Sequence, residues 1–331
     1  MKSMFEMIRE FPSQLEQAIQ IGASVSINSH SKKIQRIYVS GMGGSGIGAD
    51  FVSSFIKPYA TLPYIVGKSY EVPAFVNDET LVIISSYSGN TEETIECFKK
   101  IITKGSKIIC IASGGEVMRM AEHYHLDRIQ LPQGWSSPRA CLGFSIVAQL
   151  FAIYKLGIIP DQFINELKGT INKLKIESNS ILEKAKHLAS YLEGKIPVIY
   201  CADSIEPVAV RFRQQLNENS KILCWHHVIP EMNHNELVGW RWTQNALATV
   251  FIRNTNDHPR IQARIELTKE IVSHYTQNLI EIYSSGDSFI ERSIYLVHLL
   301  DYVSVFLADY NKIDAVEVRV IDFLKSELAK L

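Results

Sequence analysis

The stretch RIYVSGMGGSGIGAD, Arg36–Asp50, joins a short apolar segment to a run of glycines. Residues 35–40 read as a strand with β-branched and aromatic residues, and residues 47–57 have the apolar spacing of a helix. A strand that passes through glycines into a helix is typical of a parallel α/β sheet. The glycines also let the backbone approach an anion closely, beside the unpaired N–H groups of a helix start.

The rest of the chain repeats this alternation of strand and helix. Further strands are expected at residues 64–66, 80–84, 107–112, 129–131, 196–201, 248–252 and 278–283. Long helices are expected at residues 4–29, 160–193, 289–310 and 316–331. Such alternation implies parallel, doubly wound sheets, and the second half looks like another copy of the plan of the first. The sequence therefore predicts an α/β protein of two doubly wound parallel-sheet domains, residues 1–157 and 158–331.

The composition is that of a soluble globular protein with no bias toward a charged partner. Of the 331 residues, 46% are hydrophobic, and 34 basic side chains balance 35 acidic ones. A net charge of -1 provides no field that would attract nucleic acid or an anionic membrane. The first residues lack the apolar core of a signal peptide, and the five cysteines are scattered without a C-x-x-C pair. We therefore expect a cytoplasmic protein with reduced thiols.

Gly41–Gly46 also satisfies G-x-G-x-x-G, the pattern of a dinucleotide site. Such a site needs an acid at the end of the second strand, about 20 residues past the glycines, to bind the ribose. Here Gly67 and Lys68 occupy that place, and Glu71 already lies in a turn. The sequence therefore argues against NAD, and we expect the protein to need no cofactor.

A second loop, SSYSGNTEET at residues 85–94, points to a phosphate that is not part of a dinucleotide. Ser86, Ser88 and Thr91 lie after a buried strand, at the strand end where open α/β sheets bind their ligands. Three hydroxyls and the amides of a helix start form a cradle for a compact phosphomonoester. Ordinary N-capping would account for one hydroxyl, and three favour phosphate binding.

The motifs GMGGSG and SYSGNTEET resemble those of the sugar isomerase (SIS) domain family, whose members bind phosphorylated sugars at this pair of loops. With SSPRA, NEN and PEMNHNELVGW added, essentially the whole chain is similar to the bifunctional phosphoglucose/phosphomannose isomerases. The resemblance implies two SIS-type, flavodoxin-like domains. It also implies a cofactor-free isomerase that interconverts glucose 6-phosphate, and mannose 6-phosphate, with fructose 6-phosphate. The residues implied to bind the 6-phosphate are Gly44, Ser45, Ser86, Ser88 and Thr91.

Conversion of an aldose phosphate into a ketose phosphate moves a proton between C2 and C1. The reaction requires a base, groups that open the ring and a cation near the enediolate. The resemblance implies that Glu218 is the base, that Arg139 lies near the enediolate and that Lys325 assists at the ring oxygen. From the residues alone, these side chains could also be a solvated acid, a salt-bridge partner at a helix start and a surface lysine.

His234, in PEMNHNE, matches the histidine that opens the sugar ring in this family. The resemblance implies that this histidine reaches the active site of the neighbouring subunit, which predicts a homodimer. His234 follows Glu218 by 16 residues, a spacing consistent with a helix, a strand and a loop that bring both side chains to one cleft. The cleft between the two domains is expected to carry the acid–base chemistry.

The segment before the last predicted helix departs from the family. Related sequences often have a stretch rich in proline and threonine there, in which a threonine helps to admit both C2 epimers. Here residues 314–319 read DAVEVR, with neither residue type. The resemblance therefore supports activity on glucose 6-phosphate more strongly than activity on mannose 6-phosphate.

Two alternative functions remain open at this point. A zinc-dependent mannose 6-phosphate isomerase would use a cluster formed by His226, His227, Glu231 and His234. The spacing of these residues fits no standard zinc pattern and the chain lacks an all-β pattern, so no metal is expected. A non-catalytic, sugar-phosphate-binding SIS regulatory protein would keep the phosphate cradle, but it would need none of the candidate catalytic residues.

Overall fold

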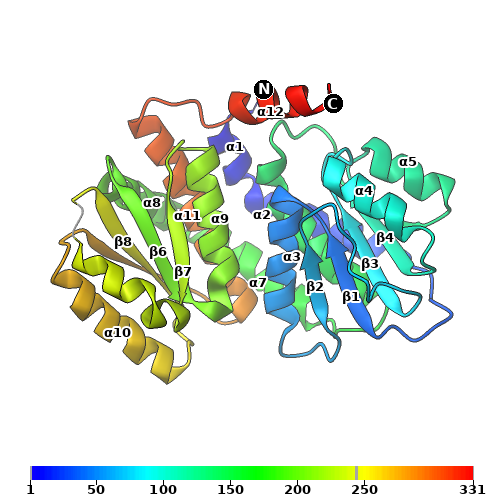
Figure 1. Cartoon of the computed structure of the whole chain (residues 1–331), viewed down its shortest axis with the longest axis horizontal. Helices are drawn as coiled ribbons and strands as arrows, with labels where there is room; N and C mark the ends of the chain where they lie inside the picture. The colour runs from blue at the N-terminus through cyan, green and yellow to red at the C-terminus, as the bar shows by residue number, and fades with distance from the viewer. Residues whose placement is uncertain (1, 243–244, 331) are drawn as a thin grey trace. The chain divides into compact units, whose positions relative to one another are not determined.

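The computed structural model describes residues 2–242 and 245–330, and the chain divides into two compact units (Figure 1). Unit 1 contains residues 9–175 and 288–290. Unit 2 contains residues 2–8, 176–287 and the chain from residue 291 onward. Most of the N-terminal helix α1 (Met4–Arg9) therefore packs with unit 2, although it begins the half of the sequence that forms unit 1.

Unit 1 contains a five-stranded sheet in which every pairing is parallel. The strands, in the spatial order β2-β1-β3-β4-β5, are β1 (Arg36–Ser40), β2 (Tyr64–Gly67), β3 (Thr80–Ser85), β4 (Lys107–Ala112) and β5 (Asp127–Gln130). Every residue of β3 and β4 is buried, as expected for parallel strands with helices on both faces. The prediction of a doubly wound parallel sheet in the first half is confirmed.

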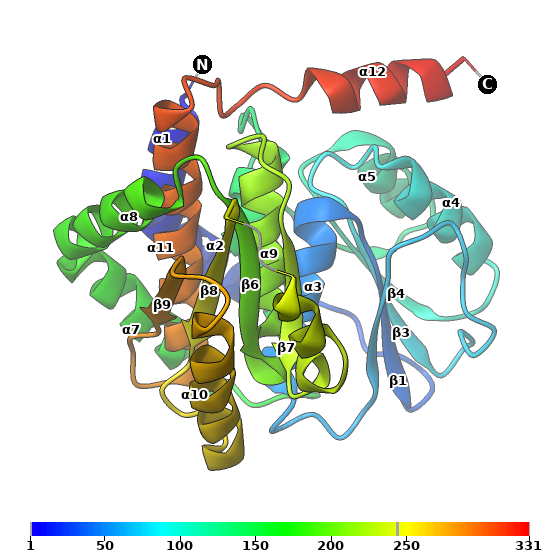
Figure 2. The ribbon, with the colours of Figure 1, turned by 60° about the vertical axis from the view of Figure 1, so that its left-hand side comes forward.

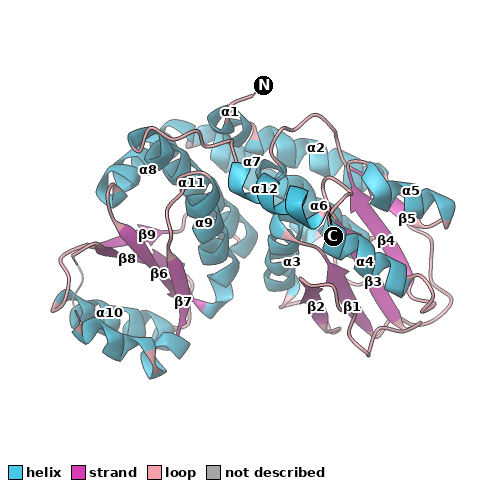
Figure 3. Ribbon diagram, turned by 45° about the horizontal axis from the view of Figure 1, so that its top comes forward, coloured by secondary structure: helices cyan, strands magenta, loops and turns pink. Residues whose placement is uncertain are grey.

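Helices cover both faces of this sheet (Figure 3). They are α2 (Phe11–Ser24), α3 (Gly43–Ile56), α4 (Glu92–Ile101), α5 (Gly115–His123), α6 (Leu142–Tyr154) and α7 (Gln162–Ile176). α4 and α5 share one core cluster with the sheet, through Phe98 and Val117, whereas α2 and α3 both pack against α6. α6 is apolar on all sides because it is enclosed, and its residues 142–153 are all buried. None of the described helices is long and apolar enough to cross a membrane.

Unit 2 contains a four-stranded sheet that is also parallel throughout (Figure 2). In the spatial order β7-β6-β8-β9, the strands are β6 (Ile196–Ala202), β7 (Trp225–Ile229), β8 (Leu247–Arg253) and β9 (Leu279–Tyr283). The helices are α8 (Ser178–Leu192), α9 (Glu206–Glu218), α10 (Pro259–Ser273), α11 (Phe289–Tyr310) and α12 (Arg319–Leu328). Two 3₁₀ helices, η3 (Glu231–His234) and η4 (Glu236–Arg241), share a core cluster with α10 and the sheet. The second predicted parallel sheet is confirmed as well.

Three of the long predicted helices have different bounds in the structure. The helix expected at residues 4–29 consists of α1 and α2, which are separated at Glu10. Proline is tolerated only in the first turn of a helix, so a new helix begins just before Pro12. The helix expected at residues 160–193 consists of α7 and α8, separated at Glu177. The last helix begins at Arg319 instead of residue 316.

The glycines of the first motif lie mostly in a helix and not in a loop. α3 begins at Gly43, before the predicted start at residue 47, and the amide of Ser45 already donates to Met42 O at 3.0 Å. A Cβ added to Gly48 would lie 2.3 Å from Ser145 Oγ of α6, so only glycine permits this close packing. Tertiary packing thus outweighs the low helix propensity of glycine, which is about 1 kcal/mol per residue relative to alanine.

Candidate active site

The two predicted phosphate loops meet at one edge of the sheet of unit 1. They follow β1 and β3, which are neighbours, so both lie at the carboxyl ends of parallel strands. A Cβ added to Gly41 would lie 2.9 Å from Ser85 O, and the amide of Tyr87 donates to Ser45 Oγ at 3.3 Å. The start of α3 and the loop after β3 are therefore in direct contact.

The hydroxyls of the second loop differ in exposure and in partners. Ser86 is 2% exposed, and its Oγ accepts from the amide of Gly89 at 3.1 Å and lies 2.8 Å from Thr91 Oγ1. Ser88 is exposed, and its Oγ accepts from the amide of Asn90 at 3.2 Å. Thr91 is the N-cap residue of α4 but forms no side-chain cap hydrogen bond, so capping does not explain its hydroxyl. Ser88 and Thr91 are thus more accessible to a ligand, and Ser86 holds Thr91 in place.

A third loop, not predicted from the sequence, forms hydrogen bonds with the loop that follows β3. It follows β4, and Ser113 donates to Tyr87 O through both its amide, at 2.8 Å, and its Oγ, at 2.7 Å. A Cβ added to Gly89, whose φ is +70°, would lie 1.8 Å from Gly114 O. The two backbones therefore touch at glycines. The signal was present in the sequence as a pair of glycines, Gly114 and Gly115, directly after a buried strand.

Arg139 lies beside the start of α3. It belongs to the 3₁₀ helix η1 (Pro138–Cys141) and is 7% exposed. A Cβ added to Gly44 would lie 3.4 Å from Pro138 O and 3.7 Å from Arg139 Cα, so η1 lies in van der Waals range of the start of α3. Gln14 of α2 anchors η1 by donating to Ala140 O at 2.8 Å. The structure thus brings Arg139 and the phosphate loops together within unit 1.

Lys68 places a positive charge near the same helix start. It follows β2 and forms an ion pair with Asp50 of α3. A Cβ added to Gly46 would lie 3.2 Å from Lys68 Cε, so the lysine side chain lies against the first turns of α3. An ammonium cannot accept the hydrogen bond of a ribose hydroxyl, which agrees with the argument against a dinucleotide.

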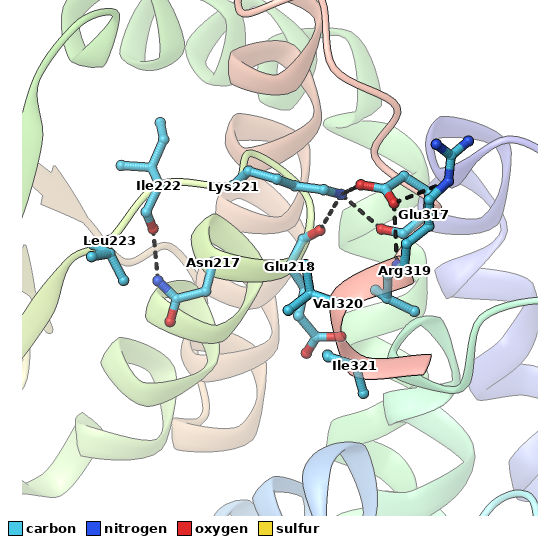
Figure 4. A pocket seen from close by; sticks show the side chains of 10 residues that line it. Asn217, Glu218, Lys221, Ile222, Leu223, Glu317, Arg319, Val320 and Ile321 are labelled. Atoms are coloured by element: carbon cyan, nitrogen blue, oxygen red, sulfur yellow. Dashed lines mark hydrogen bonds and ion pairs between the residues drawn. The ribbon is translucent and has the colours of Figure 1, made fainter. Parts of the chain in front are cut away.

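Glu218 lies at the C-terminal end of α9, in the wall of a pocket of unit 2 (Figure 4). The pocket has a volume of about 320 Å³ and is lined by residues 217, 218, 221–223 and 317–321. Its lining is mostly apolar, with Val320 and Ile321 of α12 among the side chains that face it. A half-buried carboxylate in such surroundings is suited to moving a proton.

α9 is fixed to α11 at two levels, which holds Glu218 in place. Arg211 forms a buried bidentate pair with Asp301, in which Nε donates to Oδ1 at 3.1 Å and Nη2 donates to Oδ2 at 2.8 Å. Two turns later, Asn219 Nδ2 donates to Ser304 Oγ at 2.9 Å. Paired guanidinium and carboxylate groups have a defined geometry, so the end of α9 cannot slide along α11.

His234 is exposed at the end of η3, while its neighbours in the motif have structural partners. Asn233 Nδ2 donates to Thr268 Oγ1 of α10 at 2.9 Å. Asn235 Oδ1 accepts from the amide of Glu236 at 2.6 Å and so begins η4. The motif therefore forms a braced loop that presents the imidazole of His234 to the solvent.

Glu236 fastens this loop to the sheet of unit 2. Its Oε1 accepts from Tyr200 OH at 2.6 Å and from Trp225 Nε1 at 3.0 Å. Tyr200 OH in turn accepts from Trp240 Nε1 at 2.9 Å. Burial, together with the carboxylate of Glu236, holds the pKa of Tyr200 well above its usual value, so the phenol stays protonated and donates.

Within one chain, Glu218 and His234 lie at opposite ends of the sheet of unit 2. α9 begins at the carboxyl end of β6 and returns to the amino end of the sheet at Glu218. β7 then runs parallel to β6, so His234 lies beyond the carboxyl end of the strands. The expectation that a strand and a loop would bring both side chains to one cleft is therefore wrong for a single chain.

Lys325 lies on α12 outside the residues that line the pocket. Ile321, the last lining residue, precedes it by about one helical turn. None of the residues of α12 is buried, and the apolar side chains of Phe323 and Leu324 are exposed together with it. The structure thus places Lys325 close to the pocket along the helix, but it does not bring the ammonium to Glu218.

Of the histidines that suggested a metal site, His226 has other partners. His226 Nδ1 lies 3.2 Å from a guanidinium nitrogen of Arg213, and His226 Nε2 lies 3.5 Å from Glu206 Oε1. Burial and the charge of Arg213 lower the pKa of His226. In the described ranges, no group of three or more His, Cys, Asp or Glu residues could hold a metal ion.

Comparison with protein families matches both halves of the chain. Residues 31–158 match the SIS domain, and residues 181–328 match the bacterial phospho-glucose isomerase C-terminal SIS domain. A bifunctional phosphoglucose/phosphomannose isomerase from Caldicellulosiruptor bescii is 36% identical over 338 residues, which cover 99% of each chain. A protein of the same name from Aquifex aeolicus is 37% identical over 297 residues, which cover 89% of this chain and 90% of the relative.

Solved structures share the fold at much lower identity. The C-terminal domain of glucosamine-fructose-6-phosphate aminotransferase from Francisella tularensis matches with a TM-score of 0.76 and 16% identity. The match covers 95% of this chain and 98% of that one. At this identity the likeness shows the fold alone.

Proposed function

The chain belongs to the bifunctional phosphoglucose/phosphomannose isomerase family, and we propose that it interconverts glucose 6-phosphate and mannose 6-phosphate with fructose 6-phosphate. Its relatives are isomerases, so a non-catalytic sugar-phosphate-binding protein is not favoured. One observation carries the proposal. At the carboxyl ends of β1 and β3 in unit 1, the start of α3 contacts the loop of Ser88 and Thr91, beside Arg139.

The 6-phosphate binds at this edge of unit 1. The start of α3 offers backbone amides to an anion, and the hydroxyls of Ser45, Ser88 and Thr91 are further donors. Gly44 has no side chain, so the phosphate can approach the backbone at the start of α3 closely. Hydrogen bonds to a charged group are stronger than those between neutral groups, so a few of them suffice to hold the substrate.

Glu218 moves the proton. In the open-chain aldose its carboxylate takes the proton from C2, and the electron pair of that bond forms the C1–C2 double bond of an enediolate. The same carboxylic acid then returns the proton to C1, while the hydroxyl proton of O2 passes to O1 and the electron pair left on O2 forms the carbonyl of the ketose. The Arg139 guanidinium stabilises negative charge that exists only in the transition state and the intermediate, so it lowers the barrier more than it strengthens binding.

His234 opens the sugar ring in the active site of a second subunit, and Lys325 assists at the ring oxygen. The separation of Glu218 and His234 within one chain supports a homodimer in which each site takes its histidine from the partner. α12 has no buried residue, so it must pack more closely against the pocket before the Lys325 ammonium can reach the ring oxygen. The five free cysteines support a cytoplasmic location.

The decisive experiment is a coupled assay of fructose 6-phosphate formation from each aldose phosphate, with wild type and Glu218→Gln. This variant keeps the shape and removes the base, so kcat should fall by about 10²- to 10⁴-fold while KM changes little. Glu183→Gln, at an exposed acid of α8, is the matched control and should be fully active. Turnover of Glu218→Gln within a few-fold of wild type would remove Glu218 from the mechanism.

A further inference from the structure

The ammonium of Lys221 connects two parts of the wall of the Glu218 pocket (Figure 4). Nζ donates to Glu218 O at 2.7 Å, to Glu317 O at 2.8 Å and to Asp314 O at 2.9 Å. It also lies 3.6 Å from the carboxylate Oε1 of Glu317. The carbonyl of Glu218 is among the last of α9, where partial negative charge accumulates and a cation is favourable. One side chain therefore ties the end of α9 to the segment that precedes α12.

The backbone at Lys221 has a conformation that would favour glycine. Its φ is +55°, in the left-handed region that residues with a Cβ adopt at a steric cost. Glycine would adopt this conformation without that cost. The backbone at this position therefore does not require a lysine, whereas the side chain makes three hydrogen bonds to main-chain carbonyls.

We infer that Lys221 is a positioning residue for Glu218, and this inference rests on the proposed role of Glu218 as the base. Residues 317–321 form the pocket wall opposite Glu218, and the ammonium bonds to the main chain on both sides. A base must lie within hydrogen-bond reach of the proton it abstracts, and a displacement of about 1 Å can lower the rate by about 100-fold. Lys221 sets the separation of the two walls, and with it the distance from the carboxylate to the substrate.

This role predicts a particular kinetic signature. Lys221 acts on the proton-transfer step through Glu218, whereas the 6-phosphate binds to unit 1. Loss of the hydrogen bonds from Lys221 to the two walls, called the Lys221 tether below, should therefore lower kcat and leave KM nearly unchanged. A lysine that merely stabilised the fold would lower the melting temperature, but it would not change kcat per folded molecule.

The experiment compares Lys221→Gly with Lys312→Gly. Lys312 also has a φ of +55°, and its side chain is exposed, so both variants relieve the same backbone conformation but only the first removes the tether. We expect kcat of Lys221→Gly to fall by about 10- to 100-fold, with KM within about 2-fold of wild type. Lys312→Gly should keep its kcat. Lys221→Arg, which keeps the charge and the N–H donors, should recover part of the loss.

Two further measurements make the result decisive. Hydrogen exchange of the amides at residues 314–321 should be faster in Lys221→Gly than in Lys312→Gly. In a double-mutant cycle, adding Lys221→Gly to Glu218→Gln should lower kcat no further, because the base is already gone.

Equal kcat values for the two glycine variants would overturn the inference, and so would a full additional loss in the Glu218→Gln background. If Lys221→Gly does not fold, Lys221→Met, which preserves the volume of the side chain, gives the same comparison. Near-normal turnover of Glu218→Gln alone would refute the proposed base instead, so the two failures can be told apart.

Discussion

Mixing of two inactive variants should restore activity if His234 serves the active site of a partner subunit. Both Glu218 and His234 belong to unit 2, at opposite ends of its sheet. α9 has 13 residues, and at about 1.5 Å per residue it carries Glu218 about 20 Å from the carboxyl end of the strands. A catalytic group acts over about 3 Å, so within one chain the two side chains cannot serve the same sugar.

The perturbation is co-expression of Glu218→Gln and His234→Ala chains that carry different affinity tags. In a heterodimer, one site combines both defects and the other combines an intact Glu218 with an intact His234. The purified heterodimer should therefore have about half the turnover of wild type, and a statistical 1:1 mixture about a quarter. Each parent homodimer should retain about 1% or less. The coupled fructose 6-phosphate assay measures all four, and light scattering confirms the dimer.

A reciprocal pairing provides the control. A chain with both substitutions, paired with a wild-type chain, leaves one defect in each site, so this heterodimer should be nearly inactive. If the two residues instead acted within one chain, the wild-type chain would contribute half the normal turnover and the first heterodimer would stay inactive. That reversed pattern, or a monomer in light scattering, would refute the reasoning.

Three further outcomes are expected. Replacing both Ser45 and Ser88 by alanine should raise KM for the sugar phosphates, because each hydrogen bond lost to a charged group costs about 1–3 kcal/mol of binding free energy. An unchanged KM would exclude phosphate binding by these hydroxyls. Tyr200→Phe removes the phenol that joins Glu236 to Trp240, so urea denaturation should show a loss of about 1–3 kcal/mol, with faster hydrogen exchange at residues 231–241. Burial lowers the pKa of His298 to about 3, so the unfolded chain binds a proton below about pH 6.5 and the folded chain does not. The free energy of unfolding should therefore decrease as the pH is lowered through that window. Between pH 7 and pH 5, wild type should lose about 2 kcal/mol more of it than His298→Phe. Parallel curves of unfolding free energy against pH for the two proteins would contradict this.

The sequence by itself determined the elements and the kinds of residue at the phosphate site. β3 and β4 are short, mostly apolar runs bounded by polar turn residues, a pattern typical of a strand with both faces covered, and both were predicted within a residue. Ser86, Ser88 and Thr91 follow the end of β3. Because open parallel sheets bind ligands at the carboxyl ends of their strands, the order of residues along the chain is enough to place these hydroxyls there. Local signals of this kind depend on spacing and on neighbours within a few positions.

Only the tertiary structure decided which elements meet. Gly48 of α3 lies so close to Ser145 of α6 that a larger residue would not fit, and no pattern along the chain pairs these two helices. Glu218 and His234 are close in sequence, but a 13-residue helix and a strand carry them to opposite ends of one sheet. The contact of Lys221 with Glu317 joins positions almost a hundred residues apart. Contacts at such separations depend on how whole elements pack, and no pattern read along the chain contains that information.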